Sequence, residues 1–363
     1  MSDKSFERYL KQQALLHPAM TPQDAVKLCF QAAFGAEHIL MNPDKARAYL
    51  WEEFEQTLPQ SMQVFEPVCD EYCRCNLAAW KHLSLPPEWL FQMFYHSALE
   101  KRDNAGVLFI KYLHIVTACV NSNHLPFGSE AWQKYRDAYI TKSIRPVHHS
   151  EIYRATEHPA YRIVRSEYVT LLPVLQTLAA LSDKEKPIVI AIDGRAAAGK
   201  TTMATLLSQV LDAGVIHMDD FFLPLELRTE ERLAQSGGNI HYERFLLEVL
   251  PHLKNSESFS YRRFNCDTMD YGEPRFMQNG MWRIVEGSYS CHPAFGDYMD
   301  CRIFCDVSPE EQMNRIVNRN GTGLAQVFAS RWIPMEEQYF QAEKIQSKTD
   351  IMIRHTKPES ALL

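Results

Sequence analysis

The chain contains one run of residues whose types and spacing are those of a phosphate-binding loop. This run is GRAAAGKT, residues 194–201, and it matches the pattern G-x-x-x-x-G-K-[ST]. It follows the apolar segment IVIAIDG, which is typical of a buried strand, and a helical pattern begins directly behind it. In such a loop, glycines let backbone N–H groups point at phosphate oxygens, and the helix N-terminus favours negative charge. The sequence therefore predicts a nucleotide-phosphate site.

Two side chains of this loop have predicted tasks of their own. Lys200 would neutralise the β- and γ-phosphates, and the hydroxyl of Thr201 would bind Mg²⁺. The predicted nucleotide-binding residues are Gly194, Arg195, Ala196, Ala197, Ala198, Gly199, Lys200, Thr201 and Thr202.

Acidic residues follow the next two predicted strands. Asp219 and Asp220 come after the strand pattern at 214–218, and Glu286 ends the pattern at 281–286. Carboxyl ends of parallel strands meet at one edge of a sheet, where open α/β sheets bind their ligands. We expect the strand at 214–218 to neighbour the loop strand, so that an acid there can accept a hydroxyl proton. Glu286 suits an outer ligand of Mg²⁺, although either acid could be a solvated strand end.

A later helical pattern carries two arginines on one face. Arg315 and Arg319 are four residues apart, which places them one helical turn from each other. Phosphoryl transfer requires positive charge around the moving phosphate, and mobile arginines can supply it. The glycines at 321 and 323 would suit a hinge that closes over the nucleotide. Alternatively, Gly321 ends the helix and the arginines are solvated.

The elements that must position these residues lie in the second half of the chain. The polar segment 182–187 ends in proline and marks a boundary, so we expect one domain at 1–181 and another at 182–363. Beyond the boundary, strand patterns alternate with helical patterns, which indicates an α/β fold: a P-loop NTPase-type, mostly parallel sheet covered by helices. The predicted strands are 188–192, 214–218, 281–286 and 301–307, and the predicted helices are 201–211, 241–253, 309–319 and 335–347.

The first half is predicted to be mainly α-helical. Thr21-Pro22 and Asn42-Pro43 are helix start signals, and QVFEPVCDEYCRCNL at 63–77 has the pattern of a short hairpin. His148 and His149 are more typical of capping or solvated groups than of a metal or catalytic site. No motif indicates this domain's role; it could bind an effector, carry the acceptor or drive oligomerisation. Further predicted helices span 88–102, 105–120, 130–140 and 160–181.

Five segments in a set order resemble the uridine kinase and phosphoribulokinase family, over about residues 187–354. The resemblance implies ATP as phosphate donor and Mg²⁺ as cofactor. It further implies that Asp219, rather than Asp220, is the base for the acceptor hydroxyl and lies beside the metal. Glu286 would help to hold Mg²⁺, and Arg315 and Arg319 would clamp the phosphoryl group. The segments are GRAAAGKT (194–201), MDDFF (218–222), IVEGSY (284–289), RIVNRNG (315–321) and IPMEEQYF (333–340), before the terminal strand DIMIR.

The same resemblance predicts the acceptor side of the site. His241, in NIHYERF, stands where uridine kinases carry an acid that binds ribose hydroxyls, and Tyr261 matches a tyrosine of a second family segment. Phe222 and Arg263 complete the predicted substrate-binding set. Positive charge at 262 and 263 would suit an acceptor that bears phosphate or carboxylate, although exposed strand arginines are common.

Composition and charge exclude several other classes of protein. The chain has 38 Lys and Arg against 45 Asp and Glu, a net charge of -7, which argues against a nucleic-acid partner. No apolar run reaches the roughly 18 residues that a membrane span needs, and the first residues lack a signal-peptide core. We therefore expect a cytoplasmic protein with no membrane partner, and the nine cysteines are expected to be reduced.

Together these patterns predict an ATP-dependent phosphotransferase that acts on a hydroxyl of a small molecule, with a nucleoside as the first-choice acceptor. Two alternatives stay open: a kinase for another hydroxylated metabolite, such as a sugar phosphate or a pantothenate-like acid, and a non-catalytic ATP sensor. Assembly with further copies of the chain also stays open.

Overall fold

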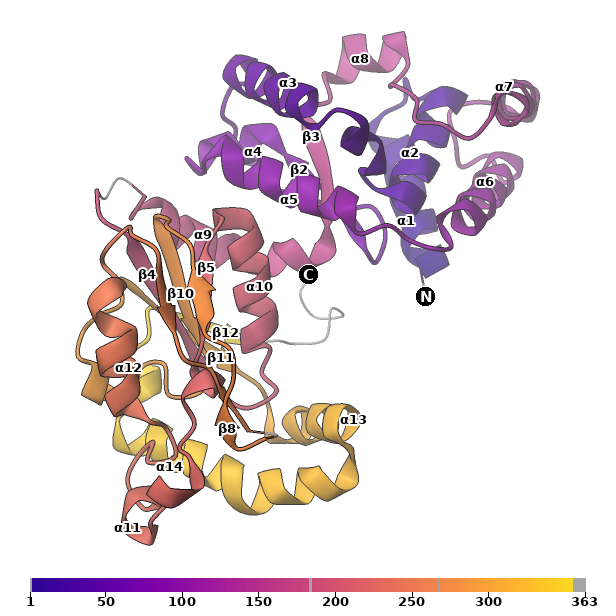
Figure 1. Cartoon of the computed structure of the whole chain (residues 1–363). Coiled ribbons are helices and arrows are strands. Elements are labelled where there is room, and N and C mark those ends of the chain that lie inside the picture. Colours follow the sequence, from indigo (N-terminus) through magenta and orange to yellow (C-terminus); the bar gives the residue numbers. More distant parts are fainter. Residues whose placement is uncertain (1, 183–184, 267, 355–363) are drawn as a thin grey trace. The chain divides into compact units, whose positions relative to one another are not determined.

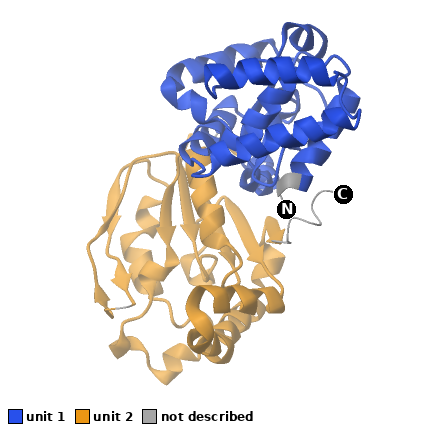
Figure 2. Cartoon of the chain, turned by 90° about the vertical axis from the view of Figure 1, so that its right-hand side faces the viewer, with its two compact units in different colours: residues 1–179 blue, residues 180–363 orange. Residues whose placement is uncertain are grey.

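The chain forms two compact units, which Figure 2 colours separately. The computed structural model describes residues 2–182, 185–266 and 268–354. One unit is Met1–Ala179 and the other is Ala180–Leu363. Each unit is described by itself below.

The second unit is built on a five-stranded sheet in the order β12-β11-β4-β10-β5, in which every neighbouring pair is parallel. The α/β fold with a parallel sheet is thereby confirmed. The expectation that β5 neighbours the loop strand β4 was wrong, because β10 lies between them. The strands are β4 (Ile188–Gly194), β5 (Gly214–His217), β10 (Trp282–Glu286), β11 (Cys301–Asp306) and β12 (Ile351–Arg354).

Helices cover both faces of this sheet (Figure 1). All of β4 is buried, and successive side chains of a strand point to opposite faces. On one face, Val189 and Ala191 pack in a core with Phe245 of α12 (Tyr242–Glu248) and Phe340 of α14 (Ile333–Ala342). On the other face lies α10 (Lys200–Leu211), in contact with β4, β5 and β10. A strand buried on both faces explains why IVIAIDG is a continuous apolar run.

Two insertions complete this unit. Between β5 and β10 lie α11 (Glu230–Leu233) and two antiparallel pairs, β6 (Phe259–Tyr261) with β9 (Arg275–Met277) and β7 (Phe264–Asn265) with β8 (Asp270–Tyr271). After β11, α13 (Pro309–Val327) is interrupted at Gly321, whose φ of 77° suits glycine. A π-helical turn, Phe328–Trp332, then leads into α14.

The first unit is mainly helical, as predicted. Its helices α1, α2, α6 and α7 share one apolar core, in which Phe6, Phe109 and Trp132 are almost fully buried. The start of α2 has the capping box expected from Thr21 and Asp24. The helices are α1 (Ser2–Leu16), α2 (Pro22–Phe34), α3 (Pro43–Gln56), α4 (Leu77–His82), α5 (Pro87–Leu99), α6 (Ala105–Asn121), α7 (Ser129–Lys142), α8 (Glu151–Glu157) and α9 (Leu172–Ala179).

A three-stranded antiparallel sheet in this unit corrects one prediction. β1 (Phe65–Pro67) and β2 (Tyr72–Asn76) form the expected hairpin, but β3 (Tyr161–Arg165) lies where a helix was predicted. The prediction of a helix over 160–181 is therefore wrong for its first part. The segment YRIVR pairs with the buried strand β2, and this pairing outweighs the helical spacing of its apolar residues.

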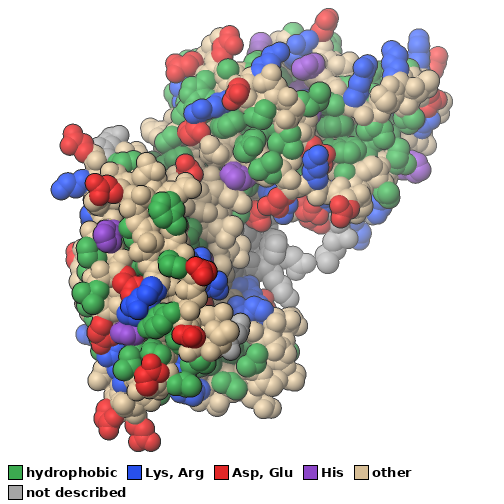
Figure 3. Space-filling model, viewed as in Figure 1, with side chains coloured by type: hydrophobic (Ala, Val, Ile, Leu, Met, Phe, Trp, Pro, Cys, Tyr) green, Lys and Arg blue, Asp and Glu red, His purple; other side chains and the backbone are tan. Residues whose placement is uncertain are grey.

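The surface agrees with the mixed charge of the sequence. Acidic and basic side chains are interspersed on the face of each unit that Figure 3 shows. Among the helices of the described residues, none has both the length and the apolar character that a membrane crossing requires.

Candidate functional site

The phosphate-binding sequence forms a tight loop between β4 and α10. Its backbone takes positive φ values at Gly194 (135°), Ala197 (58°) and Gly199 (91°). A Cβ atom on Gly194 would lie 2.1 Å from the carbonyl oxygen of Cys305, so this position requires glycine. Because α10 begins at Lys200, its unpaired N–H groups and its positive dipole end adjoin the loop. The loop is thus built to bind an anion.

The ammonium group of Lys200 is folded back over this loop. Its Nζ donates to the carbonyl oxygens of Gly194 (2.7 Å) and Arg195 (2.9 Å) and to Oγ of Ser288 (3.2 Å). All three partners are neutral, so the positive charge stays available to an anionic ligand.

A buried carboxylate holds the loop against the neighbouring strand ends. Asp193, the residue before Gly194, is fully buried and accepts hydrogen bonds from the N–H of Tyr289 (3.1 Å) and the hydroxyl of Tyr339 (2.7 Å). It also accepts from the N–H of Cys291 (3.0 Å). Burial raises its pKa above the usual aspartate range, while these hydrogen bonds oppose the rise. Tyr289 keeps a positive φ of 75°, an uncommon conformation for an aromatic residue.

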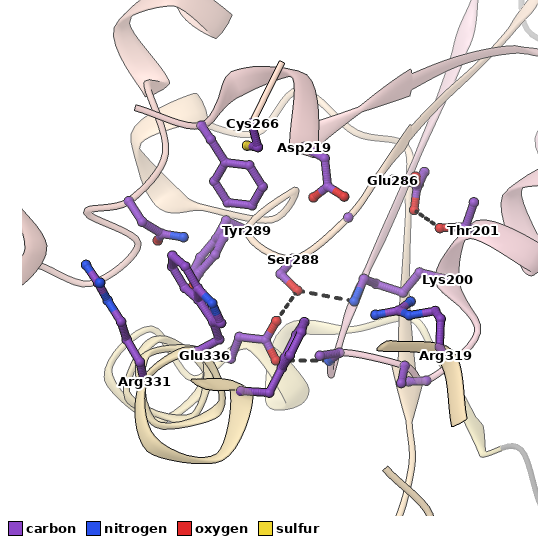
Figure 4. A pocket seen from close by; sticks show the side chains of 18 of the residues that line it. Lys200, Thr201, Asp219, Cys266, Glu286, Ser288, Tyr289, Arg319, Arg331 and Glu336 are labelled. Carbon is purple, nitrogen blue, oxygen red and sulfur yellow. Dashed lines mark hydrogen bonds between the residues drawn. The ribbon is translucent and has the colours of Figure 1, made fainter. Parts of the chain in front are cut away.

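A cavity of about 660 Å³ opens beside the loop, and Figure 4 shows the side chains that line it. We call it the phosphate-loop cavity. It brings together predicted residues from separate segments of the sequence: loop residues 196–202, Asp219, Phe222, Glu286, Arg315 and Arg319. Parallel strands end at this edge of the sheet, which explains why residues distant in sequence meet there.

Asp219 and Glu286 come from adjacent strands. In the sheet register, Glu286 of β10 lies opposite His217 of β5, two residues before Asp219. The carboxylate of Glu286 accepts a hydrogen bond from Oγ1 of Thr201 (3.3 Å) and also contacts Nδ1 of His217. Hydroxyl and carboxylate oxygens therefore converge beside the phosphate loop.

The two aspartates of MDDFF have different surroundings. Asp219 is open to the cavity, whereas Asp220 is buried and accepts from the hydroxyl of Tyr261 (2.9 Å). Asp220 also pairs with Nε of Arg263 (3.3 Å) and Nε of Arg275 (2.9 Å). Desolvation by the surrounding protein raises the pKa of Asp219, and the nearby Glu286 carboxylate raises it further. The positive charge of Lys200 opposes this rise. A raised pKa makes Asp219 the stronger proton acceptor once it is ionised.

Arg315 and Arg319 reach the cavity from α13. Nη1 of Arg315 donates to the carbonyl oxygen of Ala197 in the loop (3.2 Å), and its Nε pairs with Glu311 (2.9 Å). Arg319 is exposed, and its Nε donates to the side chain of Asn320 (2.8 Å). The helix packs on the loop through Ile316 and Ala196. One arginine thus contacts the loop, and the other is exposed beside Asn320.

Sequence reasoning missed a glutamate that touches the loop directly. Glu336 of α14 is buried and accepts from the N–H of Ala196 (2.9 Å) and the hydroxyl of Ser288 (2.6 Å). Ser288 in turn accepts from Lys200, so one chain of hydrogen bonds crosses the cavity (Figure 4). Both residues lie in segments that carry the family resemblance, IVEGSY and IPMEEQYF, which is the signal that could have singled them out.

The wall opposite the loop is aromatic and basic. The rings of Phe222 and Trp332 lie 6.4 Å apart, and the guanidinium of Arg331 is 5.1 Å from the Trp332 ring. Arg228 also lines this wall. Asn239 is buried there, and within the described part of the chain its Oδ1 has no hydrogen-bond donor. These groups suit a ligand with a planar part and polar substituents.

Five predicted residues lie elsewhere in the described structure, outside the phosphate-loop cavity. His241 contacts Glu243 (3.2 Å), and Tyr261 and Arg263 are engaged by Asp220. The carbonyl of Gly194 accepts from Lys200, and the side chain of Arg195 pairs with Asp306 (2.9 Å). Of the predicted acceptor-side set, Phe222 lines the cavity, whereas Tyr261 is bonded to the buried Asp220. The segment that follows Tyr261 nevertheless reaches the cavity, through Cys266 and Met269 (Figure 4).

Similarity to known proteins is found among solved structures. No protein-family model matches the sequence, and no curated protein matches it. Solved structures that resemble it include a possible uridine kinase from Bacillus stearothermophilus, with 19% identity, a TM-score of 0.40 and coverage of 52% of this chain and 98% of that one.

Two further structures match similarly. A candidate fructose transport system kinase from a Silicibacter species has 20% identity and a TM-score of 0.39, covering 47% of this chain and 91% of the other. TT1252 from Thermus thermophilus has 16% identity and a TM-score of 0.31, covering 48% and 91%. These similarities, like the sequence resemblance, involve about half of the chain. Because their TM-scores are low, the proposals below rest on the site itself.

Proposed function

We propose that the protein is a small-molecule kinase that transfers the γ-phosphoryl group of ATP to a hydroxyl. One observation carries this proposal: the carboxylate of Asp219 and the ammonium of Lys200 line the same cavity as the phosphate loop. A proton acceptor and a phosphate cradle that face one space are the two parts that phosphoryl transfer needs. An ATPase that acts on water needs no second surface to bind an acceptor. This cavity offers such a surface, the aromatic and basic wall around Phe222 and Trp332.

In the proposed reaction, the acceptor oxygen attacks the γ-phosphorus and its proton passes to Asp219. The new P–O bond forms as the bond to the bridging β–γ oxygen breaks, and ADP leaves. Lys200 and the loop N–H groups neutralise the phosphate oxygens, and Arg315 and Arg319 add charge from the lid. The break at Gly321 suits an opening and closing motion of the lid.

The oxygen donors beside the loop fit Mg²⁺. Thr201 supplies a hydroxyl, and Glu286 and Asp219 supply carboxylates, which are the ligand types that this hard cation prefers. When bound, the ion would neutralise charge on the phosphate oxygens. Because Mg²⁺ usually keeps several waters, two or three protein oxygens suffice.

The aromatic and basic wall suits a nucleoside as acceptor, and it also suits an acceptor that carries negative charge. The rings of Phe222 and Trp332 could hold a flat base. Asn239 could accept a base or sugar hydrogen, since among the described residues no donor reaches its Oδ1. Arg228 and Arg331, however, add two positive charges to this wall. These charges favour the second candidate, an acceptor that already bears phosphate or carboxylate. We infer as well that the two units are separate domains, divided near residues 181 and 182, and that the protein acts in the cytoplasm.

The proposal is tested by incubating the full chain with Mg²⁺-ATP and a panel of nucleosides, sugar phosphates and pantothenate. ADP release is followed, and any phosphorylated product is confirmed by mass. Turnover with uridine or cytidine supports the nucleoside kinase, and turnover only with an anionic acceptor supports the second candidate. ATP binding without turnover on any acceptor would overturn the kinase and favour an ATP sensor.

A further inference from the structure

The first unit has a polar cavity of its own, which the proposed kinase reaction does not use. Its volume is about 990 Å³, and we call it the N-terminal cavity. Residues of α1, α3, α8 and the small sheet line it. Among them are Gln12, Tyr49, Glu66, Arg74, Tyr153 and Tyr161. A cavity of this size that is lined by amides, phenols and charged groups is suited to a polar small molecule.

A buried arginine with incomplete hydrogen bonding lines this cavity. Arg74 is only 4% exposed, and its Nη1 and Nη2 donate to neutral amides, Gln13 (2.9 Å) and Gln31 (3.3 Å). Within the part of the chain that the structure describes, its Nε–H has no acceptor. A buried guanidinium that lacks a hydrogen-bonded anion is costly, because burial removes its water without a full replacement. The missing acceptor points to a ligand.

Glu66 stands next to this guanidinium without closing on it. Its Oε2 lies 3.8 Å from Nη1 of Arg74, which is too far for a hydrogen bond, and its side chain remains one-third exposed. Its Oε1 instead accepts from Nε2 of Gln13 (2.5 Å). A positive and a negative group thus lie side by side, each with unused capacity to bind a further group.

A hydrogen-bond network holds the arginine and its neighbours in place. The guanidinium carbon of Arg74 lies 4.1 Å from the centre of the Tyr161 ring. The Tyr161 hydroxyl lies 2.6 Å from Nε2 of His149, and Nδ1 of His149 lies 2.8 Å from Asp24. Burial lowers the pKa of His149 to about 4, so the ring is neutral near pH 7 and acts as acceptor to Tyr161. Such a network fixes the binding groups before a ligand arrives.

We propose that the N-terminal cavity binds a free α-amino acid, or a molecule that ends in an α-amino acid group. The α-carboxylate would take the unused donors of Arg74, and the adjacent ammonium would bind Glu66. An α-amino acid carries its ammonium and its carboxylate on the same carbon atom. Arg74 and Glu66 present the complementary charges, 3.8 Å apart. A simple anion would meet repulsion from Glu66, and from Glu52 and Glu157, which also line the cavity.

The test uses the full chain and the protein amino acids as individual probes. Thermal stabilisation identifies a candidate, and calorimetry measures its affinity. The same measurement is repeated with two analogues of that candidate, the α-hydroxy acid that lacks the ammonium and the amine that lacks the carboxylate. We expect each analogue to lose affinity by about tenfold or more, because each leaves one charged group unpaired.

Two variants test whether the amino acid binds in the N-terminal cavity. Glu66→Gln should weaken the binding by about tenfold or more, and Arg74→Lys should do the same, since lysine lacks the fork that matches a carboxylate. Glu71→Gln is the matched control, because Glu71 pairs with Arg102 and lies outside the cavity. If the Arg74 variant does not fold, the partly exposed Glu66 still allows the test. The proposal would be overturned if no amino acid binds at millimolar concentration. It would also be overturned if either analogue binds with the affinity of the amino acid, or if Glu66→Gln binds the amino acid with wild-type affinity.

Discussion

The two units place their polar groups by different means. In the second unit, the phosphate loop, Asp219 and Glu286 lie where three strands of the parallel sheet end, so local sequence patterns predict them. In the first unit, the contact between Asp24 and His149 joins residues 125 positions apart, and the bond from Arg74 to Gln13 spans 61. A sequence motif reveals a site only where residues that are close in the sequence form that site. A site assembled by tertiary packing is visible only in the structure.

The largest expected effect tests the motif-built site. Lys200→Ala should lower the rate of phosphoryl transfer by roughly 10²- to 10³-fold, because one preorganised positive charge is lost from the phosphate oxygens. Steady-state kinetics with Mg²⁺-ATP measure the change. Lys254→Ala is the control, since Lys254 pairs with Asp300 outside the cavity and should leave the rate unchanged. Equal rates for the two variants would show that Lys200 does not contribute to phosphoryl transfer.

A somewhat smaller effect is expected at the lid. Replacing both Arg315 and Arg319 by alanine should lower the rate by roughly a hundredfold, since both supply charge to the transferring group. We expect the KM for ATP to change less than kcat, because closure serves the transition state. Arg302→Ala, whose side chain pairs with Asp297, is the matched change outside the cavity. A double variant with normal kcat would show that the arginines are only solvated.

A pH-dependent effect tests the network of the first unit. His149 has a folded pKa of about 4 and an ordinary unfolded value near 6.5, so the unfolded state binds more protons between these values. Its contribution to stability is present above pH 6.5 and is lost as pH falls to 4, at about 1.4 kcal/mol per pH unit. Denaturant unfolding of wild type and His149→Gln measures the slope. The exposed neighbour variant His148→Gln should keep the wild-type slope, and an unchanged slope in His149→Gln would contradict the prediction.

The smallest expected effect concerns the glutamate that the motif did not reveal. Glu336→Gln should tighten ATP binding by about threefold to tenfold, because it removes a negative charge next to the N–H of Ala196 in the phosphate loop. Equilibrium nucleotide binding measures the change. Glu310→Gln is the control, since Glu310 is exposed in the first turn of α13 and lies outside the cavity. Unchanged or weaker binding in Glu336→Gln would show that its carboxylate does not oppose the nucleotide.

Much of the second unit could be predicted because its signals are local. The strand, the loop and α10 follow one another within residues 188–211, and each step has its own pattern of apolar residues and glycines. The position of Asp219 and Glu286 at one sheet edge follows from parallel strands alone. The strand order could not be predicted, because no local pattern tells that β10 separates β5 from β4.

The remaining features depend on packing between distant segments. β3 is a strand because β2 offers it a partner, about 90 residues earlier in the chain, and its own sequence reads equally as part of a helix. His241 and Tyr261 were expected at the acceptor side, but the contacts of Asp220 and Glu243 hold them elsewhere. Trp332 and Glu336 reach the cavity only because the chain turns after Gly321.

The most direct test of the kinase is γ-phosphoryl transfer by wild type and Asp219→Asn. Labelled ATP is followed into an acceptor that the panel identifies, and ATP affinity is measured in parallel. We expect wild-type turnover and a loss of roughly 10²- to 10⁴-fold in Asp219→Asn, because an asparagine amide cannot accept the hydroxyl proton. ATP binding should be retained, since the phosphate loop, Thr201 and Glu286 are unchanged. Transfer that survives the Asp219→Asn change would contradict the account.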